Sequence, residues 1–345
     1  MHDEDTARTD VRRLTKGTRT VSRMRAALYD RYGGPEVLYE GTVAKPGAGP
    51  GEVLVRVHAA SVNGGELLGR AGRIRPVTGL AGRGFPKRTG IDFAGEVVET
   101  ASGVSEFAPG DRVWGGLPRA FGSAAEFVAV APRRLAPAPA GIDLVEAAAL
   151  PGVGTTAVTA LRDKARLAPG ERLLVRGASG GVGSVAVQLG RAYGAHVTAL
   201  AGAENLDFVR ELGADEAFDY ASTEPEDLPP FDVVLNTVGT GMGAYRRRLT
   251  RNGRMVTITF DIERALASLS YVAASAVFGP RRIRAFSGDP GHELFAELTR
   301  LTESGAVRPV VDRVLPLAEI AEAHRVLEAG GVRGKVVVRV VGTRA

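Results

Sequence analysis

The spacing of hydrophobic and polar residues changes once along the chain, close to residue 143. Up to about residue 140, short apolar runs alternate with polar positions, as in the stretch 52–60, and Gly/Pro-rich turns separate the runs. Alternation with a period of two is typical of strands, and little of this part has helical spacing. The pattern therefore predicts a compact β-rich first domain.

Beyond residue 143, apolar runs of strand length alternate with stretches of helical spacing. Strands are expected at 172–176, 195–200, 215–219, 231–236 and 254–260. Helices of about 10 to 15 residues between them are typical of βαβ units in a doubly wound parallel sheet. Because that sheet is then complete, the tail from about residue 310 is expected to return to the first domain.

Residues 172–184 combine a short apolar run, a turn of small residues and the start of a helix. Ala178, Gly180 and Gly183 take the first, third and sixth places of the pattern G-x-G-x-x-G, with alanine replacing the first glycine. Small residues let the backbone approach a pyrophosphate, and free N–H groups at the helix start bind its oxygens. The stretch predicts a dinucleotide site, with a purely structural glycine turn as the alternative.

Length and composition narrow the class of protein. A chain of 345 residues is too long for one ordinary core, so two domains are expected. The absence of cysteine excludes disulfides, thiolate metal sites and a cysteine nucleophile. The sequence has no run of about 18 apolar residues, so we expect no membrane-spanning helix and, by default, a cytoplasmic protein.

The net charge of +5 is unevenly distributed, because basic residues gather in residues 1–23. Such an arm can bind nucleic acid or a membrane surface. This stretch has no aromatic residues among its charges, which nucleic-acid-binding segments commonly have. We therefore interpret it as a disordered basic extension and expect no nucleic-acid partner.

Short motifs spread from about residue 24 to 341 resemble the medium-chain dehydrogenase/reductase superfamily, and within it the zinc-independent quinone oxidoreductase-like branch of quinone and enone reductases. The stretches that carry the resemblance are 60–63, 90–95, 109–113, 150–157, 177–183, 212–215, 218–220, 231–239 and 334–338. The resemblance implies an α/β protein with a GroES-like β-barrel domain, at 24–145 and 310–345, and an inserted Rossmann domain with a doubly wound parallel sheet, at 146–309. It places the active site in the cleft between the two domains.

Two positions indicate whether the chain could bind a catalytic zinc ion. Zinc-dependent members of the superfamily carry a cysteine where this chain has Asn63, and Gly-His-Glu where it has Gly90-Ile91-Asp92. A catalytic zinc needs three protein ligands, so no metal is expected. Without a Lewis acid to polarise an alcohol oxygen, alcohol oxidation is disfavoured.

The resemblance then implies reduction of a small apolar electrophile, by hydride transfer to a quinone or to the activated C=C bond of an enone or enal. The cofactor supplies the hydride, and the protein supplies position and an enclosed site. The alternative function is a redox sensor or scaffold that binds NAD(P)H without catalysis. A turnover assay separates the two.

The resemblance also assigns residues. Asn63, the one candidate catalytic residue, matches a position beside the nicotinamide ribose, and its alternative role is that of a turn former. Thr155 matches a position beside the nicotinamide or is a helix cap, and Asp92 is interpreted as a turn residue rather than an acid. The full set expected to bind the cofactor is Asn63, Thr155, Ala178, Ser179, Gly180, Gly181, Val182, Gly183, Asn205, Tyr220, Gly239 and Lys335.

The choice of cofactor depends on the residues after the strand 195–200. Related chains often carry a basic residue at about Glu204 or Asn205 to bind the 2′-phosphate of NADPH, and this chain does not. Tyr220 matches a residue that stacks near this phosphate, and Lys335 or Arg333 could reach it. We therefore expect NADPH, with NADH as the alternative because Glu204 is acidic.

Two further stretches suggest contacts of the Rossmann domain. The run 254–260 alternates and is expected to be an exposed edge strand that joins a homodimer. The uncharged stretch Ala265 to Phe278 is too short to cross a bilayer and is expected to form a helix bordering the substrate cleft. A core helix and a dimer-interface helix are its alternatives.

Overall fold

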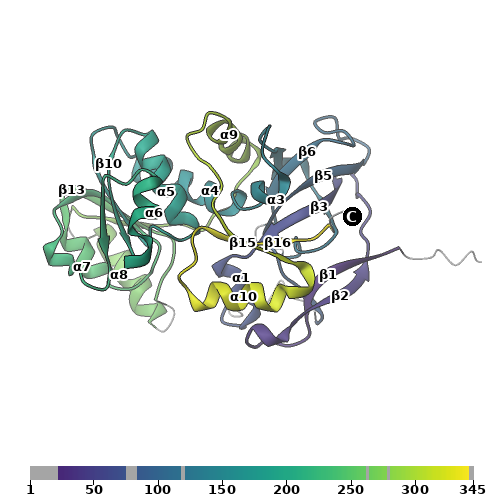
Figure 1. Ribbon diagram of the computed structural model, residues 1–345, viewed down its shortest axis with the longest axis horizontal. Helices are drawn as coiled ribbons and strands as arrows, with labels where there is room; N and C mark the ends of the chain where they lie inside the picture. Colours follow the sequence, from purple (N-terminus) through teal and green to yellow (C-terminus); the bar gives the residue numbers. More distant parts are fainter. Residues whose placement is uncertain (1–21, 75–83, 118–120, 262–263, 278–279, 342–345) are drawn as a thin grey trace, which may run out of the picture.

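The computed structural model describes residues 22–74, 84–117, 121–261, 264–277 and 280–341 of the chain. Two domains lie side by side along the long axis of the molecule (Figure 1). The predicted basic extension lies outside the described residues except for its last two. The second of these, Arg23, already belongs to a strand.

The first domain consists mainly of antiparallel strands, as its alternating pattern predicts. Its strands are β1 (Arg23–Tyr29), β2 (Leu38–Ala44), β3 (Val53–Ser61), β4 (Lys87–Arg88), β5 (Asp92–Thr100), β6 (Arg112–Gly116), β7 (Phe127–Val130), β8 (Leu135–Pro137), β15 (Val311–Pro316) and β16 (Lys335–Arg339). Its described helices include α1 (Gly64–Arg70), α3 (Leu144–Ala147) and α10 (Ile320–Ala329). One sheet has the order β15-β16-β3-β5-β6-β8, with β7 also paired to β3, and a smaller sheet has the order β2-β1-β4. Val55, Val57 and Phe93 are fully buried in the core of this domain.

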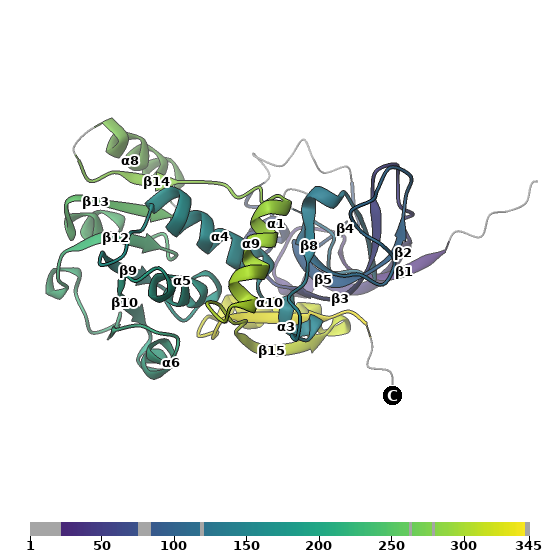
Figure 2. The same ribbon diagram turned by 90° about the horizontal axis from the view of Figure 1, so that it is seen from above.

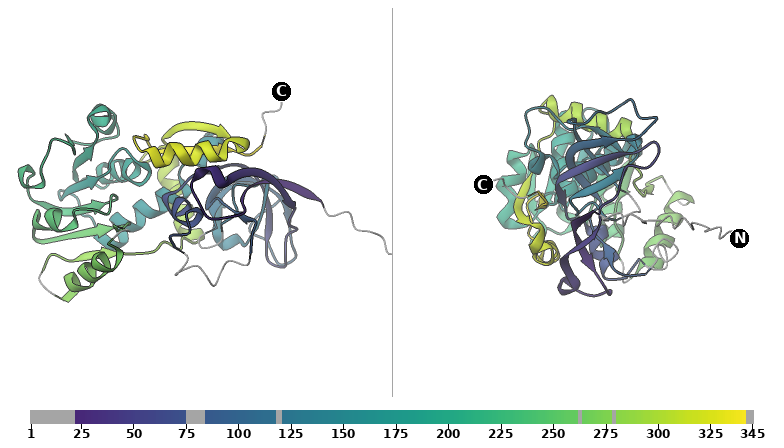
Figure 3. Two further views of the ribbon diagram at one scale, coloured as in Figure 1. Left: turned by 90° about the horizontal axis from the view of Figure 1, so that it is seen from below. Right: turned by 90° about the vertical axis from the view of Figure 1, so that its right-hand side faces the viewer.

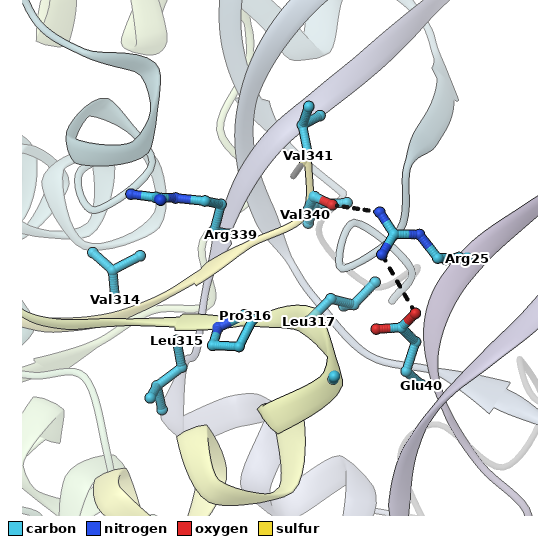
Figure 4. A pocket seen from close by; sticks show the side chains of 10 residues that line it. Arg25, Glu40, Val314, Leu315, Pro316, Leu317, Arg339, Val340 and Val341 are labelled. Atoms are coloured by element: carbon cyan, nitrogen blue, oxygen red, sulfur yellow. Dashed lines mark hydrogen bonds and ion pairs between the residues drawn. The ribbon is translucent and has the colours of Figure 1, made fainter. Parts of the chain in front are cut away.

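The C-terminal segment returns to this domain, as the sequence predicts. β16 pairs antiparallel with β3, and β15 pairs parallel with β16. β1 meets this segment at Arg25, which donates a hydrogen bond of 3.1 Å to the carbonyl of Val340 and forms an ion pair of 3.5 Å with Glu40 (Figure 4). Helix α10, which lies between β15 and β16 in the chain, packs against β2 (Figure 3).

The second domain is a doubly wound parallel sheet. Its strands are β9 (Arg172–Arg176), β10 (His196–Ala201), β11 (Glu216–Asp219), β12 (Phe231–Asn236), β13 (Leu249–Thr257) and β14 (Ile283–Ala285). The helices are α4 (Pro151–Val158), α5 (Gly181–Ala192), α6 (Leu206–Glu211), α7 (Met242–Arg247), α8 (Ala265–Val277) and α9 (His292–Glu303). The strand order β11-β10-β9-β12-β13-β14 corresponds to the order 3-2-1-4-5-6 of a Rossmann fold. This confirms the predicted α/β fold class.

The predicted edge strand is wrong. β13 lies inside the sheet, because Met255 pairs with Ile283 and Thr257 with Ala285 of β14. β14 is therefore the edge, and β13 ends at Thr257 instead of reaching Phe260. The helix predicted at 265–278 is confirmed over 265–277 as α8, and Phe278 lies outside the described residues. α8 lies beside β14 at the outer end of the domain (Figure 2). In the described part of the chain no helix is long and apolar enough to cross a membrane.

Candidate active site

The glycine turn between β9 and α5 has an open cradle at Gly180. Gly177 has φ +70°, and a Cβ there would lie 2.5 Å from the Thr237 hydroxyl oxygen. A Cβ on Gly183 would lie 2.1 Å from the carbonyl oxygen of Gly177, so Gly183 lets the helix pack on the strand. At Gly180, the N-cap of α5, the nearest atom is 3.5 Å away. The turn thus leaves space for a pyrophosphate at the helix start.

The rest of the predicted turn surrounds this cradle. Ala178 is fully buried, and the backbone carbonyl of Ser179 accepts a hydrogen bond of 2.8 Å from the N–H of Gly334. Gly334 directly precedes β16, so the barrel domain touches the turn. A Cβ on Gly181 would lie 2.9 Å from Cδ of Lys335, whose side chain therefore passes close to the turn.

Asn63 is held at both ends of its amide. Its Nδ2 donates to a carboxylate oxygen of Glu66 at 3.0 Å and of Asp92 at 3.1 Å. Its Oδ1 accepts from Nζ of Lys335 at 2.7 Å. Because an ammonium only donates and a carboxylate accepts, these partners fix the orientation of the Asn63 amide, with Oδ1 toward Lys335 and Nδ2 toward the carboxylates. Asn63 also starts α1 in a capping box with Glu66, so the turn-forming role holds alongside this network.

Asp92 is not a turn residue, and the sequence interpretation of it is wrong. It is the fully buried first residue of β5. Its carboxylate accepts from the hydroxyl of Ser61 at 2.8 Å and, across the domain boundary, from the N–H of Gly152 at 3.0 Å. Asp92 therefore ties the barrel to the start of α4.

Two buried ionisable groups complete the network. Glu66 accepts hydrogen bonds from Asn63, the Thr89 hydroxyl and the N–H of Gly90. Burial, followed by the charge of Asp92, raises the pKa of Glu66 to about 7. Burial also lowers the pKa of Lys335, whose ammonium donates to Asn63 and to the carbonyl of Val62.

The sequence analysis missed Glu66. An asparagine followed three residues later by glutamate is the signature of a capping box, and this is the signal that could have found it. The burial of its carboxylate, by contrast, depends on strands that are distant in the sequence.

A cavity of about 450 Å³ lies beside this network. Its lining includes Asp92, Gly152 and Thr155, together with apolar residues such as Phe286 and Leu294. Thr155 lies inside α4 and donates to the carbonyl of Pro151 at 2.7 Å, so the alternative role as a helix cap is wrong. No described residue of α8 lines this cavity.

At the other end of the cradle, Arg333, which lies shortly before β16, reaches the region after β10 with its side chain. Its guanidinium donates to Asn205 Oδ1 at 2.7 Å and to the carbonyl of Glu204 at 2.6 Å, and lies over the ring of Phe208 at 5.5 Å. Tyr220 lies near the end of β10, because its N–H donates to the carbonyl of Ala201. Its side chain is 65% exposed.

Lys335, by contrast, extends to the Asn63 end. Of the two cations considered for the 2′-phosphate, the structure brings Arg333 to Asn205 and Lys335 to Asn63.

Gly239 follows β12 with φ +90°, and a Cβ there would lie 2.9 Å from the backbone of Phe260. Its N–H donates to Asn236 Oδ1 at 3.4 Å, at the carboxyl edge of the sheet where ligands bind in such folds. Val182 is half-buried in the first turn of α5.

The Rossmann domain has an open phosphate cradle, and the barrel domain places a buried polar network beside it. These two features define the class of two-domain dinucleotide-dependent oxidoreductases. Comparisons with known proteins agree with this class. The family model described as the alcohol dehydrogenase GroES-like domain matches residues 49–140, and the one described as zinc-binding dehydrogenase matches residues 212–338.

Individual relatives narrow the family. The chain is 31% identical to the human mitochondrial NAD(P)H oxidoreductase RTN4IP1, over 96% of this chain and 93% of the relative. It is 34% identical to a chloroplast envelope quinone oxidoreductase homolog of Arabidopsis thaliana, over 91% of this chain and 98% of the relative. The solved quinone oxidoreductase of Coxiella burnetii superimposes with a TM-score of 0.83 at 28% identity, covering 93% of this chain and 100% of the other. The chain therefore belongs to the medium-chain dehydrogenase/reductase superfamily, in its quinone oxidoreductase-like branch.

Proposed function

We propose that this oxidoreductase uses NADPH, without zinc, to reduce a quinone or the activated C=C bond of an enone or enal. The observation that carries the proposal is the network on Asn63, which joins the glycine turn, the barrel and the apolar cavity at one place. Alkenal/one and furanone reductases among the relatives support this substrate class.

The residues of the glycine turn fit the pyrophosphate of the cofactor, and the network on Asn63 fits its nicotinamide end. Gly180 leaves the space that a pyrophosphate needs, and the helix start offers N–H groups to its oxygens. When bound, the nicotinamide supplies a hydride. Lys335, Glu66 and Asp92 hold the Asn63 amide in one orientation, so that it can position the ribose beside the cavity. Phe286 and Leu294 give that place an apolar wall.

The donor set supports a zinc-independent reaction. Asn63 is engaged with Lys335 and two carboxylates, and Ile91 stands where zinc-dependent relatives carry histidine. In the part of the chain that the structure describes, no three His, Cys, Asp or Glu side chains gather as a ligand set. The family model described as zinc-binding matches residues 212–338, and zinc independence stays part of the proposal.

The proposal is tested by following oxidation of NADPH with a panel of quinones, enones and enals, and reduction of NADP⁺ with simple alcohols, each with and without a chelator. We expect turnover with at least one quinone or enal, none with alcohols, and no effect of the chelator. Cofactor binding without any turnover would favour the sensor or scaffold instead. Alcohol oxidation that the chelator abolishes would contradict the proposal.

Preference for NADPH is expected to depend on Arg333. Two of its five donors are bonded to Asn205 and Glu204, and the remainder are available to a 2′-phosphate. The carboxylate of Glu204 accepts from Asn205, so the acid that favoured NADH is already paired. Arg333→Ser should raise the Kd for NADPH about tenfold or more and leave that for NADH unchanged, since a charged hydrogen bond contributes roughly 1.5–3 kcal/mol.

The exposed Arg325, paired with Glu322 on α10, provides the matched control as Arg325→Ser. Fluorescence titration of each variant with both cofactors measures the effect. An equal loss of NADPH and NADH affinity in Arg333→Ser would exclude a contact with the 2′-phosphate.

Location and assembly stay predictions. We retain a cytoplasmic homodimer, now formed through β14 as the edge strand, where Arg284 and Ala285 are exposed.

A further inference from the structure

The helix that lines the cavity beside the Asn63 network ends in a π-helical turn. Helix α4 continues without a break into the π-helix η3 (Thr159–Ala165). Thr156 and Thr159 line the cavity, and the next residue of this helix that does so is Lys164. In an α-helix Asp163 would follow Thr159 on the same face, because side chains three and four positions apart are neighbours. The wide turn, a feature frequent at functional sites, thus brings a cation rather than an acid to the cavity.

The ammonium of Lys164 lies beside an apolar part of the cavity wall. Its Nζ is 6.0 Å from the centroid of the Phe286 ring, and both residues line the cavity. Lys164 is half-buried, and its backbone is held to β14, because the guanidinium of Arg284 donates to its carbonyl oxygen. The position of this cation is therefore set by the Rossmann sheet.

The acids near Lys164 are paired with other cations. Asp163 forms an ion pair of 2.6 Å with Arg162, and Asp289, which also lines the cavity, forms one of 2.6 Å with Arg134. None of the ion pairs in the described part of the chain includes Lys164. Lys164 is also the one cation among the described residues of the lining, so its charge is available to a ligand.

This cation and the Asn63 network are found at opposite ends of one helix. Asp92, the other acid of the lining, accepts from the N–H of Gly152 in the first turn of α4. At about 1.5 Å per residue, the continuous helix 151–165 is roughly 20 Å long. A substrate whose reacting carbon lies beside the Asn63 network would therefore extend along the helix toward Lys164.

We propose that the substrate is an enone, enal or quinone with a carboxylate at the end remote from its reacting carbon, and that Lys164 binds this carboxylate. The inference rests on the proposed function and specifies its substrate class. One carboxylate matches the charge of one ammonium, whereas a phosphate dianion would bring a second negative charge close to Asp289. Phe286 and Leu294 suit the hydrocarbon between the two ends. The carboxylate keeps its bonds, because hydride transfer occurs at the other end of the molecule.

The test compares enals and quinones that carry an ω-carboxyalkyl chain with the methyl esters of the same compounds. We expect kcat/KM of the unaltered chain to be about tenfold higher for the acids, and added salt to reduce this preference. Lys164→Met keeps an unbranched apolar side chain beside Phe286 and removes the charge. It should abolish the preference by raising KM for the acids alone, and Lys164→Glu should reverse the preference.

Lys45→Met is the matched control, because Lys45 is also half-buried and its Nζ lies 3.8 Å from the centroid of the Phe127 ring, outside the cavity. It should keep the preference for the acids. Turnover of the esters without any preference for the acids would overturn the inference and leave the proposed function intact. A preference that Lys164→Met left unchanged would do the same.

Failure of both acids and esters to turn over would instead contradict the proposed function. Titration of the NADPH complex with the saturated acids then decides whether Lys164 forms a carboxylate site. A Kd that Lys164→Met raises about tenfold would support the site, and an equal Kd for the two proteins would exclude it.

Discussion

Replacing Gly180 by aspartate is expected to abolish NADPH binding while the fold stays intact. The nearest atom to a Cβ at Gly180 is 3.5 Å away, so the new side chain fits. Aspartate is also a favourable N-cap, and its carboxylate would accept from the N–H groups of α5 that otherwise bind the pyrophosphate. Two negative groups would compete for one helix start, and like charges so close cost several kcal/mol, which corresponds to a rise in Kd on the order of 100-fold or more.

Fluorescence titration with NADPH, paired with thermal unfolding, separates binding from folding in this variant. Gly180→Ala is the matched control, because it adds the Cβ without the charge and should lose little affinity. Gly183→Asp is unsuitable, since its Cβ would lie 2.1 Å from the backbone oxygen of Gly177 and disrupt the fold itself. If folded Gly180→Asp titrated like the unaltered chain, the turn would be only structural.

The glycine turn and the parallel strands could be predicted because long apolar runs and local turns encode them. The strand predicted at 231–236 is β12 with the same bounds, and the strand order follows from repeated βαβ units. β14 could not be predicted, because a strand of three residues, preceded by two arginines and with Arg284 at its centre, shows no periodicity. Because the sequence does not predict β14, it assigns the run 254–260 to the edge strand of the sheet.

The candidate site was less accessible from the sequence. Asn63 was found through the family resemblance, but its partner Lys335 comes from the other end of the chain. Arg333 and Lys335 are two residues apart, which in a regular strand would put them on one face. Gly334 between them has φ +72°, and the two side chains extend to opposite ends of the cofactor site. Such a break cannot be read from alternation.

The buried carboxyl of Glu66 gives the chain a pH-dependent stability that the sequence does not reveal. Its pKa is raised from 4.5 to about 7 on folding, chiefly by burial. Below pH 4.5 the group is protonated in both states and adds no penalty. As the pH rises to about 7 the unfolded chain ionises while the folded chain retains the proton, so the free energy of unfolding falls by about 3 kcal/mol across this window.

Glu66→Gln should remove this dependence. The variant is less stable at acidic pH, because one amide N–H faces the N–H of Gly90 where the carboxylate accepted, a conflict of about 1–3 kcal/mol. Its disadvantage should shrink as the pH rises from 5 to 8, since only the unaltered chain then has to bury or neutralise a charge. Urea denaturation followed by Trp114, the single tryptophan, reports on the barrel domain directly. Glu322→Gln, at an exposed ion pair with Arg325, is the matched control and should keep a constant offset. A difference between Glu66→Gln and the unaltered chain that stayed constant or grew with pH would show that Glu66 is already ionised in the folded protein.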